Sequence, residues 1–352
     1  MIDVVELFAG VGGFRLGLER ASSLFNTVLA NQWEPDAKHQ YAYDCYSSHW
    51  DNCINEDVHN ILDRIPRFDM LVLGLPCQPF SVARTSNHQL GMDDLNKGQL
   101  WWVTYSILKE HRPKYMILEN VDRLLKSPTK QRGRDFGIML KCLTDLGYKV
   151  YWRVINAAEY GLAQRRRRTF IFATTEDIPN ILSLAFPYTS KCNSLVPLDR
   201  RYYLPSTISD TYNDFKAEFG NTGCCIEGKI VTADVVPVCN IEPITLRQIR
   251  LNEEQPDLFL TDKQIERFKY LKGTKHIPRV KPNGEPYIYS EGAMPMPDII
   301  DRPGRTMLTS EGSVNRTTHV IEDISGRLRF LHPIECERLN GFDDDWTVNI
   351  PK

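Results

Sequence analysis

Short apolar runs alternate with longer amphipathic stretches over the first 175 residues of the chain. The apolar runs predict strands at Val4–Phe8, Thr27–Ala30, Met70–Leu73, Tyr115–Leu118, Val150–Val154 and Thr169–Ala173. Apolar positions with helical spacing predict helices between the strands, at Gly13–Ala21, Leu100–His111 and Arg134–Leu146. Strands separated by helices form right-handed βαβ units, so we expect an α/β fold with a mostly parallel sheet and helices on both faces.

The alternation fails after about Phe186, where prolines and scattered aromatic residues replace a regular period. We expect a second, smaller domain of short strands and long loops there. The pattern tightens again from Thr306, and Pro333–Leu339 predicts a short helix that returns to the first domain. The predicted domains are therefore residues 1–185 and 186–302, with a return segment at 303–352.

The composition is that of an ordinary globular protein, with 42% hydrophobic and 25% charged residues among 352. No apolar run reaches the roughly 18 residues of a membrane span, and the N-terminus lacks the features of an export signal. The nine cysteines form no C-x-x-C pair, which favours a reducing cytosol over a disulfide framework. The formal net charge of −2 gives no hint of a nucleic-acid partner.

A glycine-rich turn, Phe8-Ala9-Gly10-Val11-Gly12-Gly13-Phe14, lies between the first predicted strand and helix. Such a turn lets the backbone approach a nucleotide-like ligand, although a plain tight turn is the alternative. The dinucleotide fingerprint would need glycine where the chain has Arg15, so hydride transfer is a poor fit. Gln32-Trp33-Glu34 ends the second strand, where such folds bind ribose, and Asp57-Val58 could contact an adenine ring.

Two further motifs follow strands. Cys77 leaves the end of a strand between Pro76 and Pro79, which suits a thiolate held in a defined position, although most single cysteines are buried structural residues. Glu119 also ends a strand and could hydrogen-bond or protonate a substrate, whereas a cap or surface group is the common reading.

A run of four arginines, Arg165 to Arg168, leads into the last predicted strand. Such a run is usually a solvated basic patch or a phosphate contact. Because side chains alternate along a strand, we expect Arg166 and Arg168 to share one face, directed toward the site.

Together these segments resemble the motifs of the DNA (cytosine-5)-methyltransferases of bacterial restriction-modification systems, in the family's order and at similar spacing. The resemblance rests on residues 6–13, Pro76-Cys77-Gln78, Glu119-Asn120-Val121 and Gln164 to Arg168, and residues 327–342 resemble the family's late conserved block. It covers about residues 3–175 and 302–346 and leaves the middle as the target-recognition domain. It implies a Rossmann-like S-adenosylmethionine-dependent methyltransferase sheet with a smaller, loop-rich target-recognition domain.

By resemblance, the Cys77 thiolate adds to C6 of cytosine while Glu119 engages N3 and the exocyclic amine. The activated C5 then takes the methyl group of S-adenosylmethionine, leaving S-adenosylhomocysteine, and no metal is expected. Arg168 matches the arginine near the cytosine O2, and Arg166 a supporting one. Because these atoms are unreachable within a duplex, the base must be flipped out. The loop from Ser81 to about Lys97 would be a mobile lid over the DNA.

The resemblance also implies the cofactor-binding residues. They are Phe8, Gly10, Gly12 and Phe14 in the first turn, then Gln32, Trp33, Asp57, Val58, Pro76 and Leu100. Gln32 is a departure, because the family commonly has glutamate as the ribose partner, so Gln32 binds without charge assistance or Glu34 takes over. A larger departure is the lack of the usual C-terminal Gly-Asn motif. Either this chain is shortened or a second polypeptide supplies the motif, as in split members of the family.

The middle region holds a basic strip that predicts contact with double-stranded DNA. Seven basic residues lie between Lys263 and Lys281 against one acidic residue, and an exposed basic helix is the alternative. The predicted DNA-binding residues are Gln78, Ser81, Arg84, Arg165, Lys263, Arg267, Lys269, Lys272, Lys275, Arg279 and Arg316. Thr309 to Ser313 and Asn315 are further candidates for backbone contacts.

The resemblance predicts a cytoplasmic bacterial enzyme that associates with the nucleoid through DNA and protects it from a cognate restriction endonuclease. Two alternatives stay open. A tRNA-directed relative shares the catalytic motifs, but the roughly 115 residues from Phe186 to Arg302 favour DNA. A catalytically silent DNA-binding paralogue is disfavoured by intact Cys77, Glu119 and Arg168.

Overall fold

The computed structural model describes residues 1–35, 37–76, 100–179, 200–236, 241–281 and 284–351. The chain divides into two compact units, which we call the sheet unit and the second unit. The sheet unit comprises residues 1–155, 167–238 and 349–351, and the second unit comprises residues 156–166 and 239–348. No helix in the described ranges is long and apolar enough to cross a membrane.

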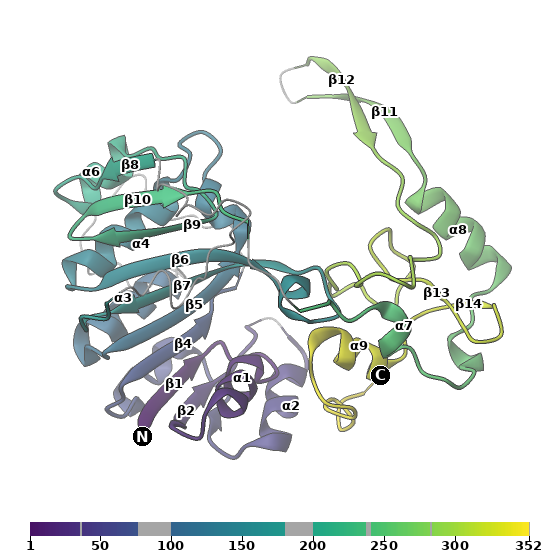
Figure 1. Ribbon diagram of the computed structural model, residues 1–352, viewed down its shortest axis with the longest axis horizontal. Coiled ribbons are helices and arrows are strands. Elements are labelled where there is room, and N and C mark those ends of the chain that lie inside the picture. Colours follow the sequence, from purple (N-terminus) through teal and green to yellow (C-terminus); the bar gives the residue numbers. More distant parts are fainter. Residues whose placement is uncertain (36, 77–99, 180–199, 237–240, 282–283, 352) are drawn as a thin grey trace. The chain divides into compact units, whose positions relative to one another are not determined.

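A ten-stranded sheet forms the centre of the sheet unit (Figure 1). Its strands are β1 (Ile2–Leu7), β2 (Phe25–Asn31), β3 (Cys53–Ile54), β4 (Met70–Gly74), β5 (Tyr115–Val121), β6 (Lys149–Asn156), β7 (Arg167–Thr174), β8 (Arg200–Tyr203), β9 (Thr222–Ile226) and β10 (Lys229–Ala233). The described helices of this unit are α1 (Gly13–Ala21), α2 (Tyr41–His49), α3 (Leu100–His111), α4 (Arg134–Asp145), α6 (Ile208–Asp214), η1 (Val58–Asn60), η2 (Leu62–Arg64) and η4 (Asp122–Lys126).

The strand order is β3-β2-β1-β4-β5-β7-β6-β9-β10-β8. The half from β3 to β5 is parallel, as predicted. The other half differs, because β7 runs antiparallel to β5 and the strands from β6 through β9 and β10 to β8 pair antiparallel. Antiparallel strands need no helical crossover, so short connections such as the one between β9 and β10 suffice.

Helices cover both faces of the parallel half, and the alternation of side chains along β1 shows why. Val5 and Leu7 face a core that includes α3 and α4, with Ile107 and Phe136 among its buried members. Val4 faces the opposite side, where Phe14 and Leu18 of α1 pack against the sheet. A strand buried on both faces has a mostly apolar sequence, and the run from Val4 to Phe8, interrupted only by Glu6, predicted β1.

The described elements of the second unit are short. They are η5 (Ala157–Tyr160), α7 (Leu246–Ile249), η6 (Pro256–Leu258), α8 (Asp262–Lys272), the hairpin β11 (Lys275–Val280) and β12 (Pro286–Glu291), the pair β13 (Ile321–Glu322) and β14 (Leu328–Arg329), and α9 (Pro333–Asn340). The predicted helix at 333–339 is α9, which begins with a capping box between His332 and Glu335.

The boundaries of these units differ from the predicted domains. Strands β8, β9 and β10 extend the central sheet, although the sequence after Phe186 predicted a separate domain. The segment 303–348, predicted to return to the first domain, belongs to the second unit. Leu339 of α9 packs there with Leu246 and Ile249 of α7, which explains the assignment.

Candidate active site and nucleic-acid interface

Two glycines in the turn between β1 and α1 have positive φ, and their surroundings differ. Gly10 has φ +58°, and a Cβ at this position would meet nothing within 4 Å. Its N–H donates to Oε1 of Gln32 at 2.8 Å, which ties the turn to the end of β2. Gly12 has φ +90°, and a Cβ there would lie 2.2 Å from the Trp50 ring. The turn is thus packed tightly below Gly12 and open beside Gly10.

The other residues predicted to bind the cofactor divide into exposed and packed groups. Trp33 is 36% exposed at the end of β2, so core packing does not account for it. Phe14 packs edge-on to Phe170, with ring centroids 6.4 Å apart. Val58 is buried in the main core, and Leu100 packs against that core at the start of α3. Contacts within the protein therefore account for the positions of Phe14, Val58 and Leu100 without a ligand.

The carboxylate of Asp57 is already engaged by its own helix. Its Oδ1 accepts from the backbone N–H of His59 at 2.9 Å and lies 2.6 Å from His59 Nδ1. Burial alone would raise the pKa of Asp57, but the hydrogen bonds from His59 outweigh it and the net pKa is lowered. Asp57 is therefore charged and available as an acceptor near neutral pH.

Glu119 and Arg168 lie next to each other at the edge of the sheet where β5 ends and β7 begins. Strands β5 and β7 pair antiparallel with Val121 opposite Arg168, which brings the two side chains together. Arg168 Nε lies 2.7 Å from Glu119 Oε1. A charge-assisted contact of this length holds the carboxylate in one orientation.

The end of β4 lies beside this pair. Gly74 pairs with Glu119, and a Cβ on Gly74 would lie 3.7 Å from Glu119 Oε2. Asn120 adds a link that the sequence did not reveal, because its buried Nδ2 donates to the Leu75 carbonyl at 3.3 Å. In the sequence, the only sign of this link is an asparagine at the end of a predicted strand. Exposed Pro76 is the last described residue here, so Cys77, Gln78, Ser81 and Arg84 lie outside the described residues, as does the predicted lid.

The prediction that Arg166 and Arg168 share one face of a strand is wrong. Strand β7 begins at Arg167, so Arg166 and Arg168 do not share one strand and its face alternation. Arg166 belongs to the second unit, where its carbonyl accepts from Ala157 N–H at 3.0 Å. Arg165 likewise pairs by its backbone with Gly304, at 2.8 Å. The arginine run therefore spans the boundary between the two units.

Gln164, which opens that run, is a structural anchor of the second unit. Its Nε2 donates to Asn340 Oδ1 at 2.9 Å, and its Oε1 accepts from Met307 N–H at 3.1 Å. Its side chain is buried, and all these partners lie on the segment that follows the middle region. The amide therefore ties residues 156–166 to α9.

A buried polar network lies below the glycine turn, and the sequence did not predict it. Glu6 of β1 is fully buried and accepts from the Tyr46 hydroxyl at 2.9 Å. Burial raises the pKa of Glu6 to about 7, and the hydrogen bond from Tyr46 opposes the rise only in part. Arg15 of α1 lies over the Trp50 ring at 4.7 Å, next to this network.

Four residues of the predicted basic strip are exposed in the second unit, as either DNA contact or an exposed basic helix would require. Lys263, Arg267 and Lys269 are exposed on α8, and Arg279 is exposed on β11. The Arg279 guanidinium lies 3.9 Å from the centroid of the Tyr289 ring across the hairpin. All four cations are exposed to solvent, and Lys269 forms an ion pair with Glu266 at 2.8 Å on the same helix.

Three of the predicted DNA-binding residues serve the fold instead. Lys272 is only 1% exposed, and its Nζ donates to the Thr318 carbonyl at 2.7 Å beside Asp298. Arg316 donates to the Gly273 and Gly292 carbonyls. Lys275, on β11, pairs with Glu291 at 3.1 Å and is mostly buried. Burial of Lys272 therefore contradicts the prediction that it contacts DNA, and protein acceptors already engage Arg316.

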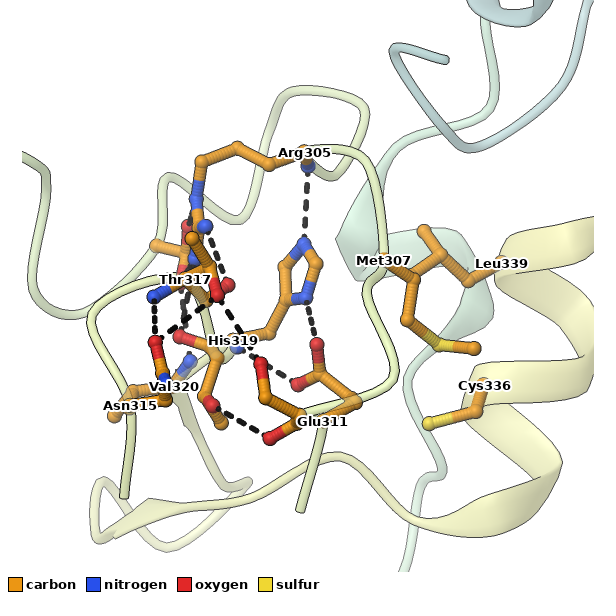
Figure 2. Close-up of polar contacts among 12 residues, drawn as sticks. Arg305, Met307, Glu311, Asn315, Thr317, His319, Val320, Cys336 and Leu339 are labelled. Carbon is orange, nitrogen blue, oxygen red and sulfur yellow. Dashed lines mark hydrogen bonds and ion pairs between the residues drawn. The ribbon is translucent and has the colours of Figure 1, made fainter. Parts of the chain in front are cut away.

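A buried histidine holds the loop that contains Thr309 and Ser313 in place (Figure 2). His319 Nδ1 lies 2.9 Å from Glu311 Oε2, and its Nε2 accepts from Arg305 N–H at 3.0 Å. The Arg305 guanidinium in turn forms two hydrogen bonds to Asp298, at 2.8 and 3.0 Å. Thr317 and Asn315 lie on the same loop, which is therefore shaped by the Arg305–Asp298 ion pair and the contact of His319 with Glu311.

Within the described residues, no group of three or more His, Cys, Asp or Glu side chains could hold a metal ion.

Known proteins resemble this chain along its whole length. Type II methyltransferase M.Sau3AI of Staphylococcus aureus is 44% identical over 99% of this chain and 89% of its own length. Type II methyltransferase M.NlaIV of Neisseria lactamica is 28% identical over 100% of this chain and 93% of its own length. A crystal structure of a Spodoptera frugiperda DNMT2 mutant has a TM-score of 0.60 at 13% identity, over 100% of this chain and 91% of that one, which shows a shared fold.

The family match agrees with the geometry at the end of β5. The C-5 cytosine-specific DNA methylase family model covers residues 2–352. The chain therefore belongs to the C-5 cytosine-specific DNA methylase family, the DNA cytosine-5 methyltransferases of restriction-modification type.

Proposed function

We propose that this chain methylates C5 of a flipped-out cytosine in a specific duplex DNA sequence, through covalent addition of the Cys77 thiolate to C6. The observation that supports the proposal is the 2.7 Å pair between Arg168 and Glu119 beside the end of β4. Cys77 follows Gly74 by three residues in the sequence. Flipping the base costs a few kcal/mol, which DNA binding must supply.

In this proposal the residues act in a fixed order. The Sγ–C6 bond forms first, and the C5–C6 electron pair becomes nucleophilic at C5. Glu119 hydrogen-bonds N3 and the exocyclic amine, so that the charge pushed into the ring is stabilised. Arg168 orients Glu119 and reaches O2. After methylation, a base removes the C5 proton and the C6–S bond breaks, which releases the thiolate.

The residues near the glycine turn fit S-adenosylmethionine, which supplies the electrophilic methyl carbon when bound. The open space beside Gly10 would admit its amino-acid end, and exposed Trp33 would stack on the adenine. Asp57, kept charged by His59, would accept from the adenine amine. Gln32 would bind a ribose hydroxyl through its amide, although its Oε1 already accepts from Gly10.

We further propose that residues 239–302 of the second unit hold the target-recognition region. Exposed cations of α8 would bind phosphates, which gives salt-dependent affinity without sequence preference. The hairpin of β11 and β12 would reach the base edges, because a two-stranded ribbon fits the major groove. Within a restriction-modification system, methylation of the same sequence would protect DNA from a cognate endonuclease, and the enzyme would remain with the nucleoid. A second polypeptide as partner stays a prediction.

A trapping experiment tests the chemistry. The chain is incubated with labelled S-adenosylmethionine and a library of duplexes that contain 5-fluorocytosine, whose C5 fluorine blocks the final elimination. We expect a covalent protein–DNA adduct, and sequencing the trapped DNA yields the recognition sequence. Cys77→Ser should abolish the adduct, whereas Cys53→Ser should retain it. An adduct that persists in Cys77→Ser would refute the nucleophile assignment.

A further inference from the structure

A short segment after β5 carries four basic side chains and no acidic one. Arg123, Lys126, Lys130 and Arg132, which we call the basic loop, are all exposed. None of these side chains forms an ion pair or hydrogen bond with any part of the chain that the structure describes. Burial would raise the pKa of Asp234, but Arg200 and Asn221 outweigh it, and the charge of nearby Lys126 adds the smallest part of the lowering. Four unpaired cations in ten residues form a concentrated positive surface.

The backbone of the basic loop is held by buried groups. Asp135 is fully buried, accepts from Ser127 Oγ at 2.7 Å and pairs with Arg134 at 3.0 Å. Gln131 Nε2 donates to three backbone carbonyls at the end of α6, those of Tyr212, Asn213 and Phe215. Burying a charge pair costs free energy of desolvation, and here the buried groups hold the backbone of the basic loop in one conformation.

The basic loop leaves the sheet at the same edge as the candidate active site. Strand β5 carries Glu119 and ends at Val121, and η4 starts at the next residue. Asp122 of η4 pairs with Arg167 at 3.2 Å, next to Arg168 on β7. A DNA strand that presents its cytosine to Glu119 therefore brings its phosphates close to this loop.

We propose that the basic loop binds the DNA phosphate backbone beside the flipped cytosine. This inference rests on the proposed function and adds a DNA-binding surface in the sheet unit, apart from the recognition region. Duplex DNA carries one negative charge per about 1.7 Å of its axis, which matches a row of unpaired cations. The contact is independent of sequence, so the loop would add affinity and orient the duplex.

Paired alanine variants of the full chain test the loop. Arg123→Ala with Lys126→Ala, and Lys130→Ala with Arg132→Ala, each remove two charges from the loop. The control is Arg67→Ala with Lys114→Ala, two exposed cations that precede β4 and β5 at the opposite edge. Binding of a random-sequence 30-base-pair duplex is measured between 50 and 200 mM salt, together with thermal stability and S-adenosylmethionine affinity.

Each loop variant should lower the salt slope by about 1.8, because each phosphate contact contributes about 0.9. Over this fourfold change in salt, the wild type should lose about tenfold more affinity than either loop variant. The control pair should keep the wild-type slope, and all variants should bind S-adenosylmethionine as the wild type does. A DNA-methylating wild type whose loop variants keep the full slope would overturn this inference alone. A wild type that neither binds nor methylates DNA would overturn the proposed function and the loop with it.

A footprint on the unmodified protein gives a second readout that needs no variant. Bound duplex should protect Lys126 and Lys130 from acetylation, whereas exposed Lys114 should react equally with and without DNA. Equal labelling of all three lysines in a DNA complex would contradict the proposal.

Discussion

A single buried carboxyl makes the stability of the sheet unit depend on pH. The Glu6 side chain is fully buried, and its Oε1 has no hydrogen-bond partner in the described structure. Burial raises its pKa to about 7 from an ordinary value of 4.5. The folded protein therefore holds this proton at pH values where the unfolded chain has released it. Stability is present below about pH 4.5 and falls as the pH rises toward about 7.

Glu6→Gln should remove this dependence, because an amide does not titrate. We expect the free energy of unfolding of the wild type to fall by up to about 3 kcal/mol between pH 5 and pH 8, relative to that of Glu6→Gln. Denaturant titrations of both proteins at the two pH values measure the difference. Parallel pH profiles for the two proteins would show that Glu6 is not the titrating group.

Two glycines of the same turn should respond differently to alanine. Gly10→Ala meets open space, so it should cost only about 1–2 kcal/mol for the positive φ while lowering the affinity for S-adenosylmethionine. Gly12→Ala drives a methyl group into the Trp50 ring and should destabilise the fold further. Thermal unfolding and titration calorimetry separate the two effects. The reverse ranking of the two stabilities would contradict this account of the turn.

Part of the candidate site was predicted from polar residues at the ends of predicted strands, because a strand end can be located from a short stretch of sequence. The motif around Glu119 and the run ending in Arg168 placed both residues near one edge, and the structure brings them to 2.7 Å. Lys272 was not predictable in this way. Its partner Asp298 is 26 residues away, and only the fold shows that a lysine in a basic strip is buried.

Helices with strong end signals were easier to predict than short strands. Helix α9 has proline in its first turn, a capping box and Gly341 after its last residue, all readable from sequence. Strands β9 and β10 have five residues each, and β9 pairs with β6, some 70 residues earlier. No local pattern specifies such a partner, so the extension of the sheet beyond β6 was missed.

The end of β14 and the start of α9 are joined by a fully buried ion triad. Arg329 forms hydrogen bonds to Asp323 at 2.6 Å and to both carboxylate oxygens of Glu335 at 2.7 Å. Burial would raise the pKa of Asp323, but Arg329 outweighs it and the net pKa is lowered. This pair therefore stabilises the protein at neutral pH and loses its contribution as the pH falls toward the acid range.

Asp323→Ala should destabilise the second unit by about 3–5 kcal/mol, because it leaves a buried guanidinium without one partner. Asp301→Ala is the matched control, since it breaks the exposed pair with Arg247 and should leave the free energy of unfolding nearly unchanged. Hydrogen exchange along β14 and α9, with denaturant unfolding, measures both. Equal losses of unfolding free energy in the two variants would mean that burial does not determine how much an ion pair stabilises this protein.

For the whole molecule, the net charge of −2 conceals an uneven distribution of cations. Exposed cations gather on α8 in the second unit and on the basic loop in the sheet unit. Acidic side chains elsewhere balance the sum, so total charge says little about a nucleic-acid partner. The location of the exposed cations on the surface is what indicates such a partner.

The division into two units predicts that cofactor binding and DNA recognition can be separated by mutation. The glycine turn and the Glu119–Arg168 pair belong to the sheet unit, whereas the hairpin belongs to the second unit. Arg279→Ala removes an exposed guanidinium from the hairpin and should lower kcat/KM for DNA by about 5- to 150-fold, the value of one good base contact. Affinity for S-adenosylmethionine should stay at the wild-type value.

Arg247→Ala is the control for that experiment, because it removes an exposed arginine of the same unit that pairs with Asp301 outside the hairpin. Methylation rates are measured on the sequence recovered by trapping, and on variants of it with one base pair changed. If Arg279 contacts a base, Arg279→Ala should reduce the ratio of the methylation rate on the matched sequence to the rate on the changed sequences. If Arg279 binds only phosphate, all rates should fall by the same factor and the salt slope should drop by about 0.9. A loss of cofactor affinity in Arg279→Ala would show instead that the two units do not act separately.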